Sequence, residues 1–191
     1  MIRGNIVVIE ENKMNIKSVE IPNESILKKD SKNYDYVDSY QIDFTSEKGI
    51  ISSTEIGKAF FTSGPEWIGV LFKIRNKIVS VIGLKVSSGN TNDIRNQIEN
   101  FKWEPGERLG LFKVFDKTNE ELVLGEDDKH LNFRVSLFIE QSLNEKNKRL
   151  TVTTTVEFKN WFGRFYFLPV KPFHKLIVPT LLKGIVKELG K

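Results

Sequence analysis

The sequence has no cysteine, and its 191 residues include only two histidines and two methionines. Without cysteine, disulfides, thiolate metal sites and thiol nucleophiles are excluded. No apolar run approaches the roughly 20 residues that a membrane-spanning helix needs, and the apolar stretch at residues 6–9 is too short for a signal peptide. We therefore expect a single cytoplasmic domain, with no membrane span.

The charges are mixed along the chain. Lys and Arg number 29 and Asp and Glu 25, for a net charge of +4. The lysines alternate with acidic residues and form no basic stripe with interleaved aromatics, so a nucleic-acid partner is not expected. Glycine-rich nucleotide loops and a nucleophile elbow are also missing, which argues against hydrolase and nucleotide-transfer chemistry. We predict no cofactor and no metal, and leave a homodimer open.

Strand patterns dominate the chain. Residues 34–44 alternate, with one face formed by Tyr36, Asp38, Tyr40, Ile42 and Phe44. Further strands are predicted at 109–115, 121–125, 131–140 and 149–158, joined by short polar loops typical of an antiparallel meander. Residues 1–33 are predicted to be an N-terminal extension or extra strands at 5–9 and 17–21. The core of the single domain would then span 34–191.

Helical patterns flank these strands. Ser52 and Glu55 have capping-box spacing before a short helix, and a second helix is predicted at 66–82. Its first turns, residues 67–72, are apolar nearly all round, so they form either core or an interaction surface for a membrane or protein. Apolar residues at 173–189 predict a long C-terminal helix that Pro179 either kinks or begins. Residues 161–166 are interpreted as one more strand or an apolar gate.

This α+β order, with two helices after the first main strand and a long C-terminal helix against an antiparallel sheet, resembles helix-grip domains (START-like, SRPBCC-type). In those domains, the cavity between sheet and helix commonly holds an apolar ligand. The runs PEW at 65–67, GEDDKHLNFR at 125–134 and PFHKLI at 172–177 are similar to the bacterial domain-of-unknown-function family 2867. The resemblance covers roughly residues 36–186. It implies no assigned activity, so no catalytic residue is carried over.

The two histidines are the first candidates for chemistry. His130 follows Asp127 and Asp128, and such a cluster is able to bind a divalent cation or act as an acid–base pair. Charged hairpin turns also have this composition without any function. His174 precedes the apolar part of the C-terminal helix, where it either reaches a ligand or hydrogen-bonds at the helix start.

Arginines and aromatics are candidates for ligand binding. Arg75 and Arg134 would hold a carboxylate or phosphate head group if they face a cavity, and are surface arginines otherwise. Trp67 and Tyr166 belong to an aromatic-rich set that either fills the core or lines a pocket.

Together these features lead us to predict a noncatalytic binding protein for a small hydrophobic or amphipathic molecule held between the sheet and the C-terminal helix. The alternative is a cyclase- or isomerase-type enzyme on the same scaffold that uses His and Asp for acid–base chemistry.

Overall fold

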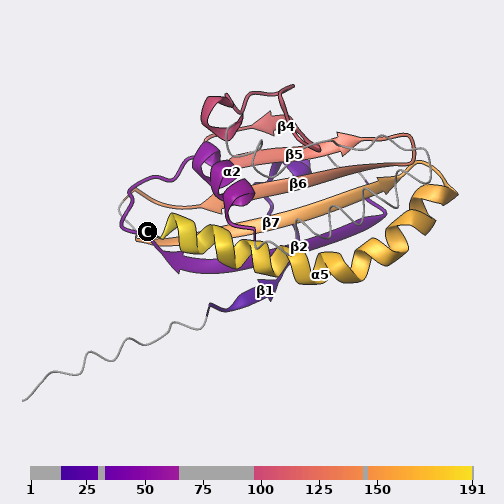
Figure 1. Cartoon of the computed structure of the whole chain (residues 1–191). Coiled ribbons are helices and arrows are strands. Elements are labelled where there is room, and N and C mark those ends of the chain that lie inside the picture. Colours follow the sequence, from indigo (N-terminus) through magenta and orange to yellow (C-terminus); the bar gives the residue numbers. More distant parts are fainter. Residues whose placement is uncertain (1–13, 30–32, 65–96, 144–145, 191) are drawn as a thin grey trace, which may run out of the picture.

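The computed structural model describes residues 14–29, 33–64, 97–143 and 146–190. They form an antiparallel seven-stranded sheet in the order β1-β2-β7-β6-β5-β4-β3, with a long helix along one face (Figure 1). The strands are β1 Ile16–Ser18, β2 Tyr36–Thr45, β3 Arg108–Leu109, β4 Phe112–Lys117, β5 Glu121–Asp127, β6 Leu131–Glu140 and β7 Asn147–Phe158. The helices are α1 Ile26–Lys29, α2 Ser53–Thr62 and α5 Trp161–Leu189. The predicted α+β class, with a sheet against a C-terminal helix, is confirmed.

The central strands follow their sequence patterns closely. Strands β6 and β7 pair from Leu131↔Phe158 to Glu140↔Arg149 without a register shift. The strand predicted at 109–115 is wrong as a single element, because the chain turns between β3 and β4. Gly110 has a φ of 59° there, in the left-handed region that glycine enters without a steric cost.

Helix α2 begins with the predicted capping box. The Ser52 side chain accepts from the Glu55 backbone N–H, and the Glu55 carboxylate accepts from Ser52. Ile56 and Ala59 bury their side chains in the main core beside Trp103, which is 1% exposed. The helix predicted at 66–82, with its apolar turns at 67–72, lies outside the described residues, as does the strand predicted at 5–9.

Helix α5 differs most from its prediction. It begins at Trp161, where the Asn160 side chain accepts from the backbone N–H of Gly163, so the strand predicted at 161–166 is wrong. The alternative prediction of an apolar gate stays a prediction. Pro179 does not begin the helix either, because Pro169, Pro172 and Pro179 all lie inside it. Each proline removes one helix hydrogen bond, and the helix curves along the sheet in Figure 1.

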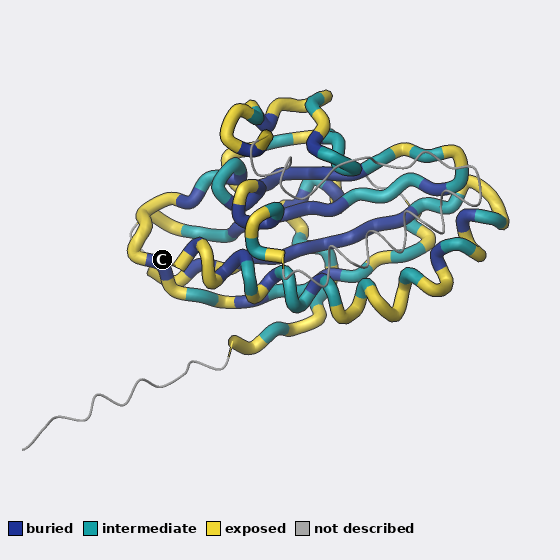
Figure 2. The backbone as a smooth tube through the Cα atoms, viewed as in Figure 1, coloured by how far each residue is buried: buried dark blue, intermediate teal, exposed yellow. Residues whose placement is uncertain are grey.

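The two halves of α5 are buried to different extents (Figure 2). In the second half, Leu182 and Ile185 are fully buried in the main core with Leu137 and Leu150 of the sheet. The first half contributes Phe167 to a smaller cluster with Leu131 and Val156. The sheet thus grips the second half of the helix directly through apolar side chains.

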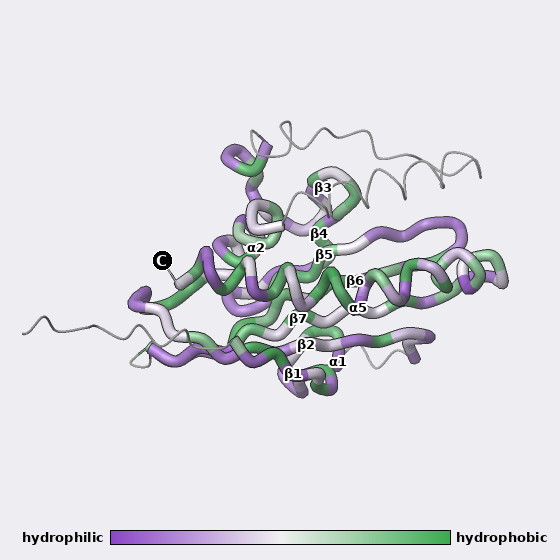
Figure 3. Tube along the Cα trace, turned by 60° about the horizontal axis from the view of Figure 1, so that its bottom comes forward, coloured by the Kyte–Doolittle hydropathy of each residue, from purple (hydrophilic) through white to green (hydrophobic). Residues whose placement is uncertain are grey.

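The other face of the sheet is covered by the segment around α1 (Figure 3). The carboxylate of Glu121, which is 2% exposed, accepts from the Ser25 hydroxyl at 2.7 Å, the Ile26 N–H at 2.8 Å and the Ser136 hydroxyl at 2.5 Å. Strand β1 also pairs with β2, from Ile16↔Ile42 to Ser18↔Tyr40. The residues before 33 therefore supply an edge strand and a segment that packs on the other face of the sheet. The edge strand is shorter than the strand predicted at 17–21.

Candidate functional site

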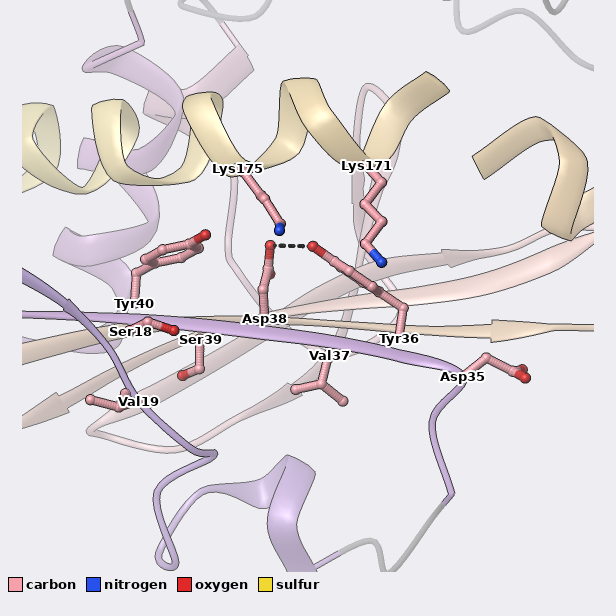
Figure 4. A pocket seen from close by; sticks show the side chains of 10 residues that line it. All are labelled: Ser18, Val19, Asp35, Tyr36, Val37, Asp38, Ser39, Tyr40, Lys171 and Lys175. Carbon is pink, nitrogen blue, oxygen red and sulfur yellow. Dashed lines mark hydrogen bonds between the residues drawn. The ribbon is translucent and has the colours of Figure 1, made fainter. Parts of the chain in front are cut away.

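A pocket of about 500 Å³ lies along the edge of β2 beside the middle of α5. Its lining side chains Tyr36, Asp38 and Tyr40 point toward α5, whereas Val37 and Ser39 point to the other side of the strand (Figure 4). The pocket is placed where β1 ends, since β1 pairs only as far as Ser18 and the next backbone contact is from the Val19 N–H to the Ser39 carbonyl. Its lining is largely polar and comprises Ser18, Val19, Asp35, Tyr36, Val37, Asp38, Ser39, Tyr40, Lys171 and Lys175.

The centre of the site is Asp38, whose side chain is only 9% exposed. Strand alternation turns Tyr36, Asp38 and Tyr40 toward α5, on the same face as the core residue Ile42. One carboxylate oxygen, Oδ2, accepts from the Tyr36 hydroxyl at 2.8 Å and lies 2.8 Å from Nδ1 of His174. The other oxygen, Oδ1, is buried and has no hydrogen-bond partner among the described residues. A carboxylate held in this way is fixed in position and keeps one acceptor free.

Tyr36 links the pocket to the smaller apolar cluster. Its ring meets the Phe167 ring edge-on at 4.8 Å between centroids, and Nζ of Lys171 lies 5.4 Å from the Tyr36 centroid. Burial raises the pKa of the Tyr36 hydroxyl, and its hydrogen bond to Asp38 adds to the effect. Burial and the nearby Asp38 charge also raise the pKa of Tyr40. Both phenols therefore stay protonated and able to donate at neutral pH.

Two lysines form the α5 side of the pocket. Lys171 and Lys175 are four residues apart, so they leave the helix on the same side, and Figure 4 shows both reaching toward β2. In the described part of the chain no ion pair within 4 Å engages either lysine, whereas the Asp35 carboxylate is occupied by Arg164 at 2.9 Å and by the Phe158 N–H at 2.7 Å. The pocket thus offers two ammonium groups next to two tyrosine rings.

The family model described as "Protein of unknown function (DUF2867)" matches residues 31–181. The chain belongs to this family. The matched region runs from just before β2 into the second half of α5, and so includes every β2 and α5 residue of the pocket. No curated protein matches the chain. Among the described helices of this DUF2867 protein, none is both long and apolar enough to cross a membrane.

Of the five predicted ligand-binding residues, His174 lies at the site through its contact with Asp38. Tyr166 is half-buried against the smaller apolar cluster, and Trp67 and Arg75 lie outside the described residues. Arg134 lies on the face of β6 that points away from α5. Its guanidinium stacks 3.4 Å from the centroid of the Phe115 ring and bonds Asp127 at 2.8 Å, so it is engaged within the sheet.

The predicted acid–base or metal residues lie at the β5–β6 hairpin, and none of them lines the pocket. Asp127 pairs with Arg134, and the Asp128 side chain accepts from the backbone N–H of Lys129. The His130 ring contacts the Phe162 ring at a tilt of 55°, with 4.7 Å between centroids. Its Nδ1 lies 3.2 Å from Oδ1 of Asn160, the residue that caps α5. Within the described ranges, no three His, Asp or Glu residues are grouped to hold a metal ion.

Sequence reasoning missed Tyr36, Asp38, Lys171 and Lys175 as site residues. One pattern does point to Asp38, because it is the single charged residue on the otherwise apolar and aromatic face of residues 36–44. A carboxylate on a buried face needs partners, which is a reason to look for a site there.

Proposed function

We propose that this DUF2867 protein is a noncatalytic binding protein for a small amphipathic molecule that carries an anionic group. The supporting observation is the pair of lysines, Lys171 and Lys175, that face the rings of Tyr36 and Tyr40 across one pocket. The ammonium groups would bind the anionic group, and the tyrosine rings would contact the apolar part.

The size and lining of the pocket support this class of ligand. A volume of about 500 Å³ falls in the range of about 300 to 1,000 Å³ that is usual for small-molecule sites. From the sequence we predicted a hydrophobic or amphipathic ligand held between the sheet and the C-terminal helix. Because Leu182 and Ile185 fill the space under the second half of α5, the pocket beside the first half is the better location. Its polar lining favours an amphipathic molecule over a purely apolar one.

Isothermal titration calorimetry with octyl phosphate and 1-octanol tests the proposal. We expect octyl phosphate to bind the wild-type protein and the double variant Lys171→Gln/Lys175→Gln to bind it at least tenfold more weakly. The matched control is Lys183→Gln/Lys187→Gln, which removes two exposed lysines with the same spacing from the same helix. Equal binding of octanol and octyl phosphate, or equal weakening in both double variants, would contradict the proposal.

A second candidate function, an acid–base enzyme, is favoured by the contact between Asp38 and His174. A carboxylate that fixes one imidazole nitrogen leaves the other nitrogen available for proton transfer. Mass spectrometry of small molecules that co-purify with the protein separates the two functions. If Asp38→Asn carries a different molecule from the wild type, a substrate has accumulated and the protein is an enzyme. If both carry the same molecule, the binding function stands.

A further inference from the structure

The first half of α5 exposes a row of large apolar side chains. Trp161, Phe165, Leu168, Pro172 and Leu176 recur every three or four residues and therefore share one side of the helix. We call them the outer stripe. Trp161 is 77% exposed and Phe165, Leu168 and Leu176 are 65–66% exposed, whereas Phe167 and Val178 on the opposite side are buried. Figure 2 shows the outward side of this part of the helix as largely exposed.

The charge of α5 is of one sign along nearly its whole length. Residues 161–187 contain no Asp or Glu and five cations, namely Arg164, Lys171, Lys175, Lys183 and Lys187. Lys183 and Lys187 are exposed and continue the outward side beyond the outer stripe. Arg164 pairs with Asp35, and Lys171 and Lys175 reach toward β2. The outward side of the helix thus presents an apolar surface with the positive charges of Lys183 and Lys187 beyond its C-terminal end.

We propose that the outer stripe docks α5 onto an anionic lipid surface, with the helix lying parallel to it. A helix with an exposed apolar face and basic neighbours binds at the boundary between head groups and acyl chains, where tryptophan is also favoured. Lys183 and Lys187 would extend their ammonium groups to the lipid phosphates while their methylene stems lie against the apolar layer.

Charge complementarity favours lipid over a second copy of this chain. Two copies packed through the outer stripe would place Lys183 and Lys187 of both copies beside an interface to which residues 161–187 contribute no acidic side chain, whereas an anionic membrane neutralises these charges. The docking surface is separate from the pocket, so this proposal goes beyond the ligand-binding function and does not depend on it.

Vesicle flotation tests the proposal. We expect the wild-type protein to float with vesicles of phosphatidylcholine and phosphatidylglycerol at 7:3, and at least tenfold less with pure phosphatidylcholine. The triple variant Trp161→Ser/Phe165→Ser/Leu168→Ser should bind the anionic vesicles at least tenfold more weakly. Ile50→Ser/Leu143→Ser is the control, because it removes apolar side chains that are 48% and 76% exposed elsewhere on the surface and should float like the wild type.

Thermal unfolding of each variant shows whether it is folded, and we expect all of them to be, since the replaced side chains are exposed. A wild-type protein that does not float, or a folded triple variant that floats as well as the wild type, would overturn the proposal. Sedimentation velocity identifies the competing occupant. A wild-type dimer that does not float, and that the triple variant converts to a monomer, would show that a second copy covers the stripe.

Discussion

The contact between Asp38 and His174 joins β2 to α5 across 136 residues of sequence, and its energy is measurable. We expect Asp38→Ala to lower the free energy of unfolding by about 3–5 kcal/mol, because each hydrogen bond to a charged group contributes about 1.5–3 kcal/mol and two are lost. Solvent screening does not reduce this value, because the Asp38 side chain is only 9% exposed and that of its partner His174 19% exposed.

Urea unfolding of a double-mutant cycle, with Asp38→Ala, His174→Ala and the double variant, isolates the pairwise energy. We expect a coupling of about 1–3 kcal/mol. Asp43 provides a matched control on the same strand. Its carboxylate lies 2.8 Å from Arg149, but the two side chains are 54% and 46% exposed. Asp43→Ala should therefore cost no more than about 1 kcal/mol.

The reasoning would be refuted if Asp38→Ala and Asp43→Ala had the same cost, or if the coupling of Asp38 with His174 were near zero. Either result would mean that burial does not strengthen the contact. The pocket would then lack a carboxylate held in a fixed position, which the second candidate function requires.

Two further predictions concern buried polar groups. Glu121→Leu should destabilise the fold by about 3–5 kcal/mol in urea unfolding, because it leaves the Ile26 N–H and the hydroxyls of Ser25 and Ser136 without their acceptor. Glu121→Gln should cost only about 1–2 kcal/mol, because the amide oxygen still accepts from the Ile26 N–H and the amide NH₂ donates to the two hydroxyls. Equal losses of stability in Glu121→Leu and Glu121→Gln would contradict this account. For Tyr36, whose pKa is raised above 10.0 by burial, the unfolded state ionises first, so stability is lost as pH rises above that value. We expect the free energy of unfolding of the wild type, relative to that of Tyr36→Phe, to fall by about 1 kcal/mol between pH 9 and pH 11. Parallel curves of unfolding free energy against pH for the two proteins would disprove this prediction.

The sequence was most informative where one face of an element packs on the core. Residues 131–140 and 149–158 alternate because one face of β6 and β7 packs against α5, and the capping box at Ser52 is a local interaction. The start of α5 was missed because its aromatic run favours a strand and its prolines disfavour a helix. Tertiary contacts overrode these preferences. Asn160 caps the helix, and Gly163 approaches the His130 carbonyl so closely that a Cβ would clash with it.

The candidate site was harder to predict than the fold. It depends on pairs that are distant in sequence, such as Asp38 with His174, and no local pattern specifies them. The site also depends on the length of β1, because the pocket lies where β1 ends. Strand ends are set by where the chain leaves the sheet, which periodicity does not determine.

The unequal burial of the two halves of α5 has a consequence for dynamics. The second half is part of the main core, so its amides should exchange with solvent only when the whole domain unfolds. The first half contains Pro169 and Pro172, which lack amide hydrogens, and it contributes few side chains to the interior. We therefore expect the first half to be a separate cooperative unit that opens at a lower free energy. Such opening would move Lys171 and His174 away from β2 and admit a molecule to the pocket while the core stays folded.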